Sequence, residues 1–216
     1  MAHANAEPEL PPIGLEPPMI IEKLGDYRRA INTDSEVARK WFDQGLALMF
    51  GFNFDGAIAS FRQATVHDPN CAMAWWGIAY SAGPNQNNPD IEAPKDEWSY
   101  SAAQRAFQLR ENEEGANRAL IDAIVKRYNY PLPDDLTIQN QQYLNAMENA
   151  HREFPLDPDI TTWTAEAMMV MQPWEYWSPE GEPLNRTSEF RGLLESVMKM
   201  HPYHPAANHL YIHPME

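Results

Sequence analysis

The stretch WFDQGLALMFGFNFDGAIASFRQATVHDP, residues 41–69, decides the fold class. If residue 38 is counted as the first position of a 34-residue unit, large and small side chains stand at fixed places along it. Trp41, Gly45, Ala57, Phe61 and Pro69 occupy positions 4, 8, 20, 24 and 32 of that unit. Small residues let two antiparallel helices approach closely, and large residues fill the gap to the next pair. The stretch therefore predicts a helical hairpin, with the proline opening a second unit.

This spacing is the tetratricopeptide repeat pattern. The next unit starts in register with Trp75 and Ala79, but GPNQNNPDIEAPKDE, residues 83–97, then interrupts it. Prolines and asparagines mark that segment as a loop, and the helix is expected to resume near Trp98. Insertions in repeat proteins fall on loops, often on the binding side.

Further helices are predicted after this second unit. They cover residues 113–128, 135–154, a segment ending before Pro173, residues 187–200 after a second loop, and a last helix opened by Pro205. Residues 7–18 contain five prolines, which predict an extended arm lying along the surface. The expected architecture is all-α: a Pro-rich arm over residues 1–34 and a right-handed solenoid of antiparallel helix pairs over residues 35–216.

The amino-acid composition argues against a nucleic-acid partner and against a membrane span. The net charge is −15, and no cluster of Lys and Arg supplies the basic footprint that a nucleic acid needs. No apolar run approaches the roughly 20 residues of a membrane span.

Cys71 is the single cysteine, so no intrachain disulfide can form, and its apolar surroundings favour a buried thiol. Small residues at Ala2–His3–Ala4 resemble the end of a signal-peptide cleavage site, which is consistent with a periplasmic or secreted protein; an ordinary cytoplasmic N-terminus is the equal alternative.

Four motifs extend the match beyond a generic repeat. FDQGLALMFGFNFDGAIASFRQA, DPNCAMAWWGIAYSAGPNQN, PWEYWSPEGEP and HPAANHLYIH occur in this order and contain GFN, CAMAWWG, GPNxN and NHxxxIH. Together they resemble a family of bacterial tetratricopeptide-repeat proteins that are often exported. The resemblance implies an architecture but carries over no particular activity, and it implies that further repeats follow the last helix. Because such a helix buries its apolar side only against a following one, we expect a C-terminal segment or a partner chain to cover it. Two positions depart from the family: Phe54 stands where members read GFNH, and Pro214 follows the second histidine.

The segment HPYHPAANHLYIHPME, residues 201–216, holds four of the seven histidines. In an unbroken helix His209, His213 and Glu216 would share one face, and His204 just before the helix could swing in. Two imidazoles one turn apart can chelate zinc, copper or iron, with a carboxylate completing the set. Pro214 cannot donate to the carbonyl of Leu210, so the helix is expected to kink or end there, which would displace Glu216.

The repeat register also predicts a concave groove. It turns four side chains into that groove, Phe42, Leu46, Trp76 and Tyr80, with Asn85 at its mouth. The alignment of Pro202 with Pro69 points His209 and His213 into the same groove. Two functions follow. One is a histidine-based metal site that further repeats would complete into a metal-dependent enzyme. The alternative is a non-catalytic scaffold that binds a peptide, a small molecule or a partner protein.

Overall fold

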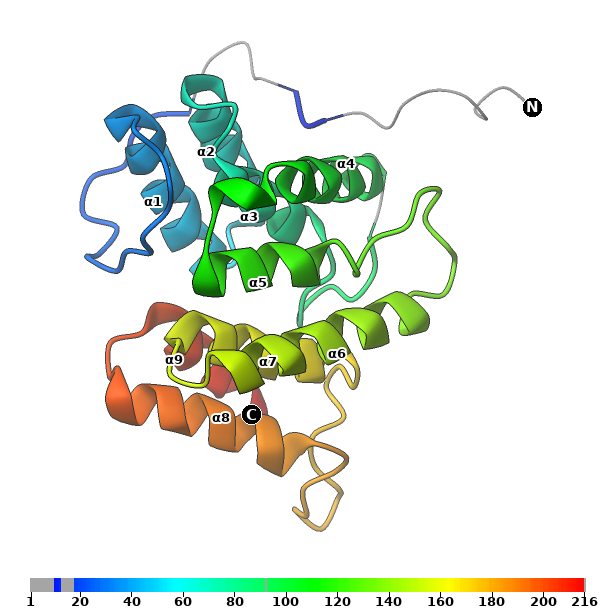
Figure 1. Ribbon diagram of the computed structural model, residues 1–216. Helices are drawn as coiled ribbons and strands as arrows, with labels where there is room; N and C mark the ends of the chain where they lie inside the picture. The colour runs from blue at the N-terminus through cyan, green and yellow to red at the C-terminus, as the bar shows by residue number, and fades with distance from the viewer. Residues whose placement is uncertain (1–9, 13–17, 92, 216) are drawn as a thin grey trace.

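The computed structural model describes residues 10–12, 18–91 and 93–215. Within these residues the chain is helical and contains no strand, only two isolated bridges, Asn85–Asn88 and Trp177–Pro183. Nine α-helices and two short 3₁₀ turns are described there (Figure 1): α1 (Glu36–Phe50), α2 (Phe54–His67), α3 (Ala72–Ala82), α4 (Lys95–Gln108), η1 (Arg110–Asn112), α5 (Gly115–Ile124), α6 (Thr137–Glu153), α7 (Pro158–Val170), α8 (Thr187–Met200), α9 (Pro205–Ile212) and η2 (His213–Met215). The predicted all-α class is confirmed.

Local capping signals explain where several helices begin. The Ser35 hydroxyl accepts a hydrogen bond from the Ala38 amide at 3.1 Å, and Asn53 caps α2 through the Gly56 amide at 3.1 Å. Asp157 caps α7 in the same way, with Pro158 in the first helical position, where its missing donor costs nothing.

Helices that follow one another along the chain pack against one another, from α1 through α4 and from α5 through α9. Phe61 of α2 lies between Gly45 of α1 and Gly77 of α3. A Cβ atom added to either glycine would lie 2.7 Å from the Phe61 ring. Small residues therefore stand where the helices approach most closely, which is the packing that the repeat spacing requires.

Helix bounds agree with the sequence in some places and differ in others. Residues 187–200 form α8 as predicted, and α6 is shorter than predicted by two residues at the start and one at the end. The helix predicted over 113–128 ends at Ile124, because the chain turns inward there and buries Arg127 and Tyr128; the Tyr128 hydroxyl donates to the Ala79 carbonyl at 2.8 Å. The last helix ends at Ile212 and continues as η2, consistent with the effect expected of Pro214.

The second half of the chain returns across the first. In Figure 1, α1–α5 form the upper part of the molecule and α6–α9 the lower part. Trp163 of α7 reaches between them, with its ring 5.9 Å from Phe50, 4.7 Å from Trp76 and 5.9 Å from Tyr80. The largest buried aromatic residues thus meet between the two parts.

Residues 18–34 run without helix along this body. The Gln44 side chain binds the Met19 carbonyl at 3.1 Å and the Ile21 amide at 2.8 Å, which fixes the segment to α1. Residues 1–9 and 13–17 of the predicted arm lie outside the described residues, as does Glu216.

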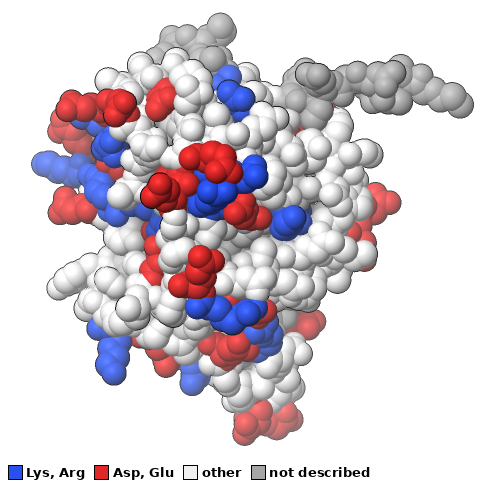
Figure 2. Space-filling model, viewed as in Figure 1, with Lys and Arg blue, Asp and Glu red and all other residues white. Residues whose placement is uncertain are grey.

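The surface carries charges of both signs. Figure 2 shows Lys and Arg side chains interleaved with Asp and Glu over the visible face, where no separate basic patch stands out. No helix in the described part of the chain is long and apolar enough to cross a bilayer.

Candidate functional site

His204 is the N-cap of α9. Its Nδ1 atom accepts a hydrogen bond from the Ala207 amide at 3.1 Å, and its Nε2 atom lies 3.0 Å from a carboxylate oxygen of Asp159. Since both ring nitrogens are engaged and the side chain is buried, His204 acts here as a helix cap through Nδ1 and as a hydrogen-bond partner of Asp159 through Nε2. It has no nitrogen left for a metal ion, in contrast to its predicted role.

His209 and His213 do lie together. Their rings stack with centroids 5.8 Å apart and planes 25° apart. His209 Nδ1 is 2.7 Å from the Phe50 carbonyl oxygen. A carbonyl only accepts, so Nδ1 carries a proton, and in the neutral imidazole Nε2 is then the nitrogen with the lone pair. Metal-binding histidines are commonly oriented by this kind of hydrogen bond.

Two aromatic residues in an unusual backbone conformation flank this pair. Phe52 stacks on His209 at 4.1 Å and lies 6.0 Å from His213, and Trp174 meets His213 edge-on at 5.6 Å. Phe52 has φ of 58° and Trp174 has φ of 65°, in the left-handed region that disfavours bulky side chains. Such a conformation costs about 1–2 kcal/mol per residue and persists only where surrounding contacts impose it. The strain is concentrated around the histidine pair.

The pair alone supplies two donors. Within the residues that the structure describes, no three His, Cys, Asp or Glu side chains gather around a point where they could hold a metal ion. Phe54, whose ring is 5.1 Å from that of Phe52, belongs to the same aromatic cluster as the histidines. Any metal would need a further donor from outside the described part of the chain.

The side chains expected to line the groove are mostly closed off. Phe42 and Leu46 are buried in the core, and Phe42 packs against Phe61 with ring centroids 5.4 Å apart. Trp76 and Tyr80 stack on each other at 5.5 Å and are covered by Trp163. Trp76 and Tyr80 face an interior that Trp163 of α7 closes, because the return of the chain fills the side that the repeat register points to. The two histidines lie against Phe52 and Trp174 instead of joining Trp76 and Tyr80.

An open pocket of about 660 Å³ lies between α2 and the first loop. Asn85 lines it, and Phe54, Ile58 and Trp98 supply apolar surface. Phe52 belongs both to this pocket and to the histidine cluster, so the two features adjoin.

Part of the N-terminal arm forms a wall of this pocket. Pro11 and Pro12 are among its lining residues, and Pro11 is buried. The Arg62 side chain donates from Nε to the Pro11 carbonyl oxygen at 2.9 Å. The same guanidinium bonds the Thr65 hydroxyl at 2.8 Å and lies 5.5 Å above the Trp75 ring, which holds it in place.

A third group, which the sequence analysis missed, lies behind Trp76 and Tyr80. Arg127, Tyr143 and Glu166 have exposed fractions of 2%, 1% and 1%. The Arg127 guanidinium is 4.5 Å from the centre of the Tyr143 ring. Burial raises the pKa of Glu166 to about 7, although the Arg127 charge and the Tyr80 hydroxyl both act to lower it. The one available signal was a single carboxylate in the apolar run TWTAEAMMV.

No protein-family model matches the chain, and neither a curated protein nor a solved structure shows significant similarity to it. The proposal for function therefore rests on the geometry of the histidine pair and of the pocket beside α2.

Proposed function

We propose that the chain is a tetratricopeptide-type right-handed solenoid that serves as a non-catalytic scaffold and binds an extended, proline-containing peptide. The site is the pocket between α2 and the first loop. The successive packing of α1 to α4 and the glycines around Phe61 support the repeat assignment. The position of the pocket beneath an insertion between two repeat helices supports the binding role.

The observation that carries this proposal is the placement of Pro11 in the pocket. Proline-rich segments are extended before they bind, and they dock in aromatic-lined grooves at little entropic cost. Here a buried proline lies in a pocket that Phe54 and Trp98 also line, and its carbonyl accepts a hydrogen bond from a charged donor, Arg62. The chain thus holds a short piece of its own arm against the open pocket.

The charge of the protein indicates which kind of peptide would displace the arm from the pocket. The chain carries a net charge of −15, and the sequence of the arm contributes Glu7, Glu9 and Glu16. Asp55 and Asp90 line the pocket together with two basic residues: Arg62, which binds the arm, and Lys95, which pairs with Asp55 at 2.7 Å. Like charges weaken the intramolecular contact, whereas a peptide with Lys or Arg beside its prolines would be attracted to this acidic protein. The proposed ligand is therefore a basic, proline-containing peptide.

The test is a titration of the full chain with a labelled peptide that has the sequence of residues 7–18 but Lys in place of each Glu. We expect saturable binding by fluorescence anisotropy, weakened about tenfold by Arg62→Gln, since a hydrogen bond from a charged group contributes about 1.5–3 kcal/mol. Arg105→Gln on α4, whose guanidinium bonds only its neighbour Gln108 at 3.2 Å among the described residues, is the matched control. Equal affinity for a peptide with glycine in place of its two central prolines would contradict the proposal.

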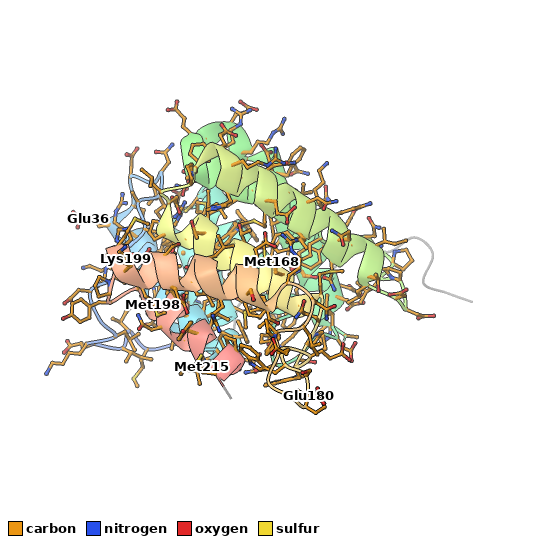
Figure 3. The ribbon with its side chains drawn as sticks, turned by 90° about the horizontal axis from the view of Figure 1, so that it is seen from below. Glu36, Met168, Glu180, Met198, Lys199 and Met215 are labelled. Carbon is orange, nitrogen blue, oxygen red and sulfur yellow. The ribbon has the colours of Figure 1, made fainter. Side chains whose placement is uncertain are left out.

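A metal site at His209 and His213 is the second candidate, and the hydrogen bond to the Phe50 carbonyl favours it. This bond holds the Nδ1 proton, so the neutral tautomer of His209 offers Nε2 as the ligand atom for zinc, copper or iron. Figure 3 shows α8 and α9 side by side, with Met215 at the outer end of α9. Ile212 and Met215 are exposed there, so a further segment or a partner chain could cover this end and supply the missing donor. A bound metal would bring Lewis acidity to the site.

Elemental analysis of protein purified without a metal-affinity tag tests this second candidate. We expect near one equivalent of metal in the native protein and none after His209→Ala with His213→Ala, with circular dichroism unchanged. In the isolated chain, Phe54→His should raise zinc affinity, because it adds an imidazole to the same aromatic cluster. Metal retained by the double variant would assign the ion to another site.

A further inference from the structure

Exposed apolar side chains gather where the N-terminal segment meets the turn between α8 and α9. Two hollows adjoin there: one of about 660 Å³ between the N-terminal segment and residues 200–205, and one of about 340 Å³ between the same segment and α1. Leu24, Gly25 and Asp26 line both hollows, so the two form one continuous surface. We call it the turn face and define it by its exposed apolar residues, Ile20, Ile21, Leu24, Met200 and Tyr203.

The apolar side chains of the turn face are gathered in one place. Their exposed fractions run from 37% for Leu24 to 94% for Tyr203, and the neighbouring Met19 is 84% exposed. Single exposed apolar residues are common on monomers, whereas a contiguous patch of several hundred Å² marks an interaction site. One large aromatic side chain carries about 150–250 Å², so the six together approach the roughly 800 Å² that each partner contributes to a stable dimer interface.

The turn face carries a projecting side chain beside a hollow. Tyr203 stands out into solvent at the edge of the larger hollow, and the smaller hollow, which shares Leu24, has Ile20 and Ile21 in its wall. In a two-fold dimer both copies offer the same patch, so a projection must find its hollow on that same patch. Tyrosine is among the residues enriched at the centres of such interfaces.

The two segments that build the turn face are fixed from behind. The Gln44 side chain of α1 accepts a hydrogen bond from the Ile21 amide at 2.8 Å. The Tyr27 ring packs edge-on against the buried His204 ring at 4.7 Å, which joins the N-terminal segment to the start of α9. Both segments lie at the left side of the molecule in Figure 1, and Figure 3 shows Lys199 at the end of α8 that leads into this turn. A surface that is already ordered loses little entropy when it binds.

The charges around the turn face suit a second copy of the same chain. The smaller hollow is lined by three basic and two acidic residues, in a chain that has 16 basic and 31 acidic ones. Arg28 and Asp43 pair with each other at 3.0 Å. Within the residues that the structure describes, Lys23, Lys40 and Asp26 take part in no ion pair of their own chain. The net charge of −15 makes two copies repel elsewhere, whereas here each offers both signs of charge to the other.

We propose that the turn face is the interface of a two-fold dimer between two copies of this chain. Tyr203 of each copy enters the smaller hollow of the other, and Lys23 of each copy lies beside Asp26 of the other. The interface shares no residue with the peptide pocket or with the histidine pair, so it stands independently of the proposed function.

The experiment is sedimentation velocity of the full chain over loading concentrations from about 1 to 200 µM, which bracket a micromolar Kd. We expect the weight-average mass to rise from that of one chain towards that of two as the concentration increases. A mass of one chain at every concentration would overturn the proposal, because the turn face would then serve a different partner. A mass that rises beyond two chains would also overturn it, since a two-fold contact closes after the second copy.

Variants assign the association to this face. Tyr203→Ser and Leu24→Ser should each weaken the dimer at least tenfold, because they remove the projecting ring and the apolar residue that both hollows share. Leu156→Ser is the matched control, since this side chain is 74% exposed and lies outside both hollows. Circular dichroism should be unchanged in all three. A dimer that survives both turn-face variants but is lost in Ile212→Ser would assign the contact to the far end of α9 and overturn the proposal.

Discussion

At the scale of single residues, Glu166 shows what the sequence can and cannot reveal. A lone carboxylate in an apolar helix is visible in the sequence as an anomaly. Its surroundings are not, because Arg127 and Tyr143 come from distant parts of the chain and only the folded structure brings them together. For His204 the sequence indicated a metal ligand, and the structure shows a cap whose second nitrogen faces Asp159. Residue type and spacing identify candidates, but hydrogen-bond partners decide their role.

The raised pKa of Glu166 predicts a specific dependence of stability on pH. Between its ordinary value of 4.5 and about 7, the unfolded chain releases this proton while the folded chain retains it. The free energy of unfolding therefore falls as pH rises through this window. In Glu166→Gln this loss is absent, so the stability of the variant relative to the parent should increase by about 2–3 kcal/mol from pH 5 to pH 8. Urea unfolding at the two pH values measures it, and parallel profiles for the two proteins would contradict the assignment.

At the scale of helices, the repeat spacing predicted the hairpins and most of the bounds, since these depend on neighbours along the chain. It failed where long-range contacts intervene. The repeat register pointed Trp76 and Tyr80 into an open groove, but Trp163 returns from α7 and covers both. The pocket instead opens beside the first loop, the segment that the sequence marked as an insertion. Local patterns thus marked the loop that borders the pocket, but they did not identify the side chains that line an open surface.

The close approach of α2 to its two neighbours gives a prediction at this scale. Gly77→Ala would place a methyl group 2.7 Å from the Phe61 ring in a filled core, so we expect a loss of about 1–3 kcal/mol in the free energy of unfolding. Gly192→Ala on α8 is the matched control, because nothing lies within 4 Å of the added carbon. That substitution should stabilise the protein by about 0.5–1 kcal/mol through higher helix propensity. Equal effects of the two substitutions in urea unfolding would contradict the packing described for Phe61.

At the scale of the whole molecule, the N-terminal segment joins elements that are distant in the chain. Asp159 at the start of α7 accepts hydrogen bonds from the Tyr27 hydroxyl at 2.9 Å and from Arg29 at 2.6 Å, and it pairs with His204 of α9 at 3.0 Å. Asp157 adds a second carboxylate to Arg29 at 3.2 Å. The sequence predicted residues 1–34 as a surface arm, and nothing in its proline content indicated that part of it would bind a buried carboxylate. The network joins residues 45 to 132 positions apart, beyond the reach of any local pattern.

This network should govern how the molecule responds to acid. Burial alone would raise the pKa of Asp159, but the His204 hydrogen bond and the Arg29 charge outweigh burial and hold it below its ordinary value. Its contribution to stability is therefore present above about pH 4, the unfolded pKa, and is lost as pH falls through the folded pKa. Asp159→Asn lacks the charge at every pH, so at pH 7 it should cost about 3 kcal/mol, because Arg29 and His204 lose a buried partner.

The difference between Asp159→Asn and the parent should shrink as the pH falls below 4, since the parent then protonates the same carboxyl. Hydrogen exchange should show faster exchange of residues 18–34 in the variant at pH 7, which separates release of this segment from a general loss of stability. Asp122→Asn is the control, because Asp122 is a half-exposed partner of Arg110 at 3.7 Å, and an exposed pair contributes less than about 1 kcal/mol. If exchange in residues 18–34 matched that of the parent while stability fell, Asp159 would be stabilising α7 and α9 alone, and the N-terminal segment would be held by its contacts with α1.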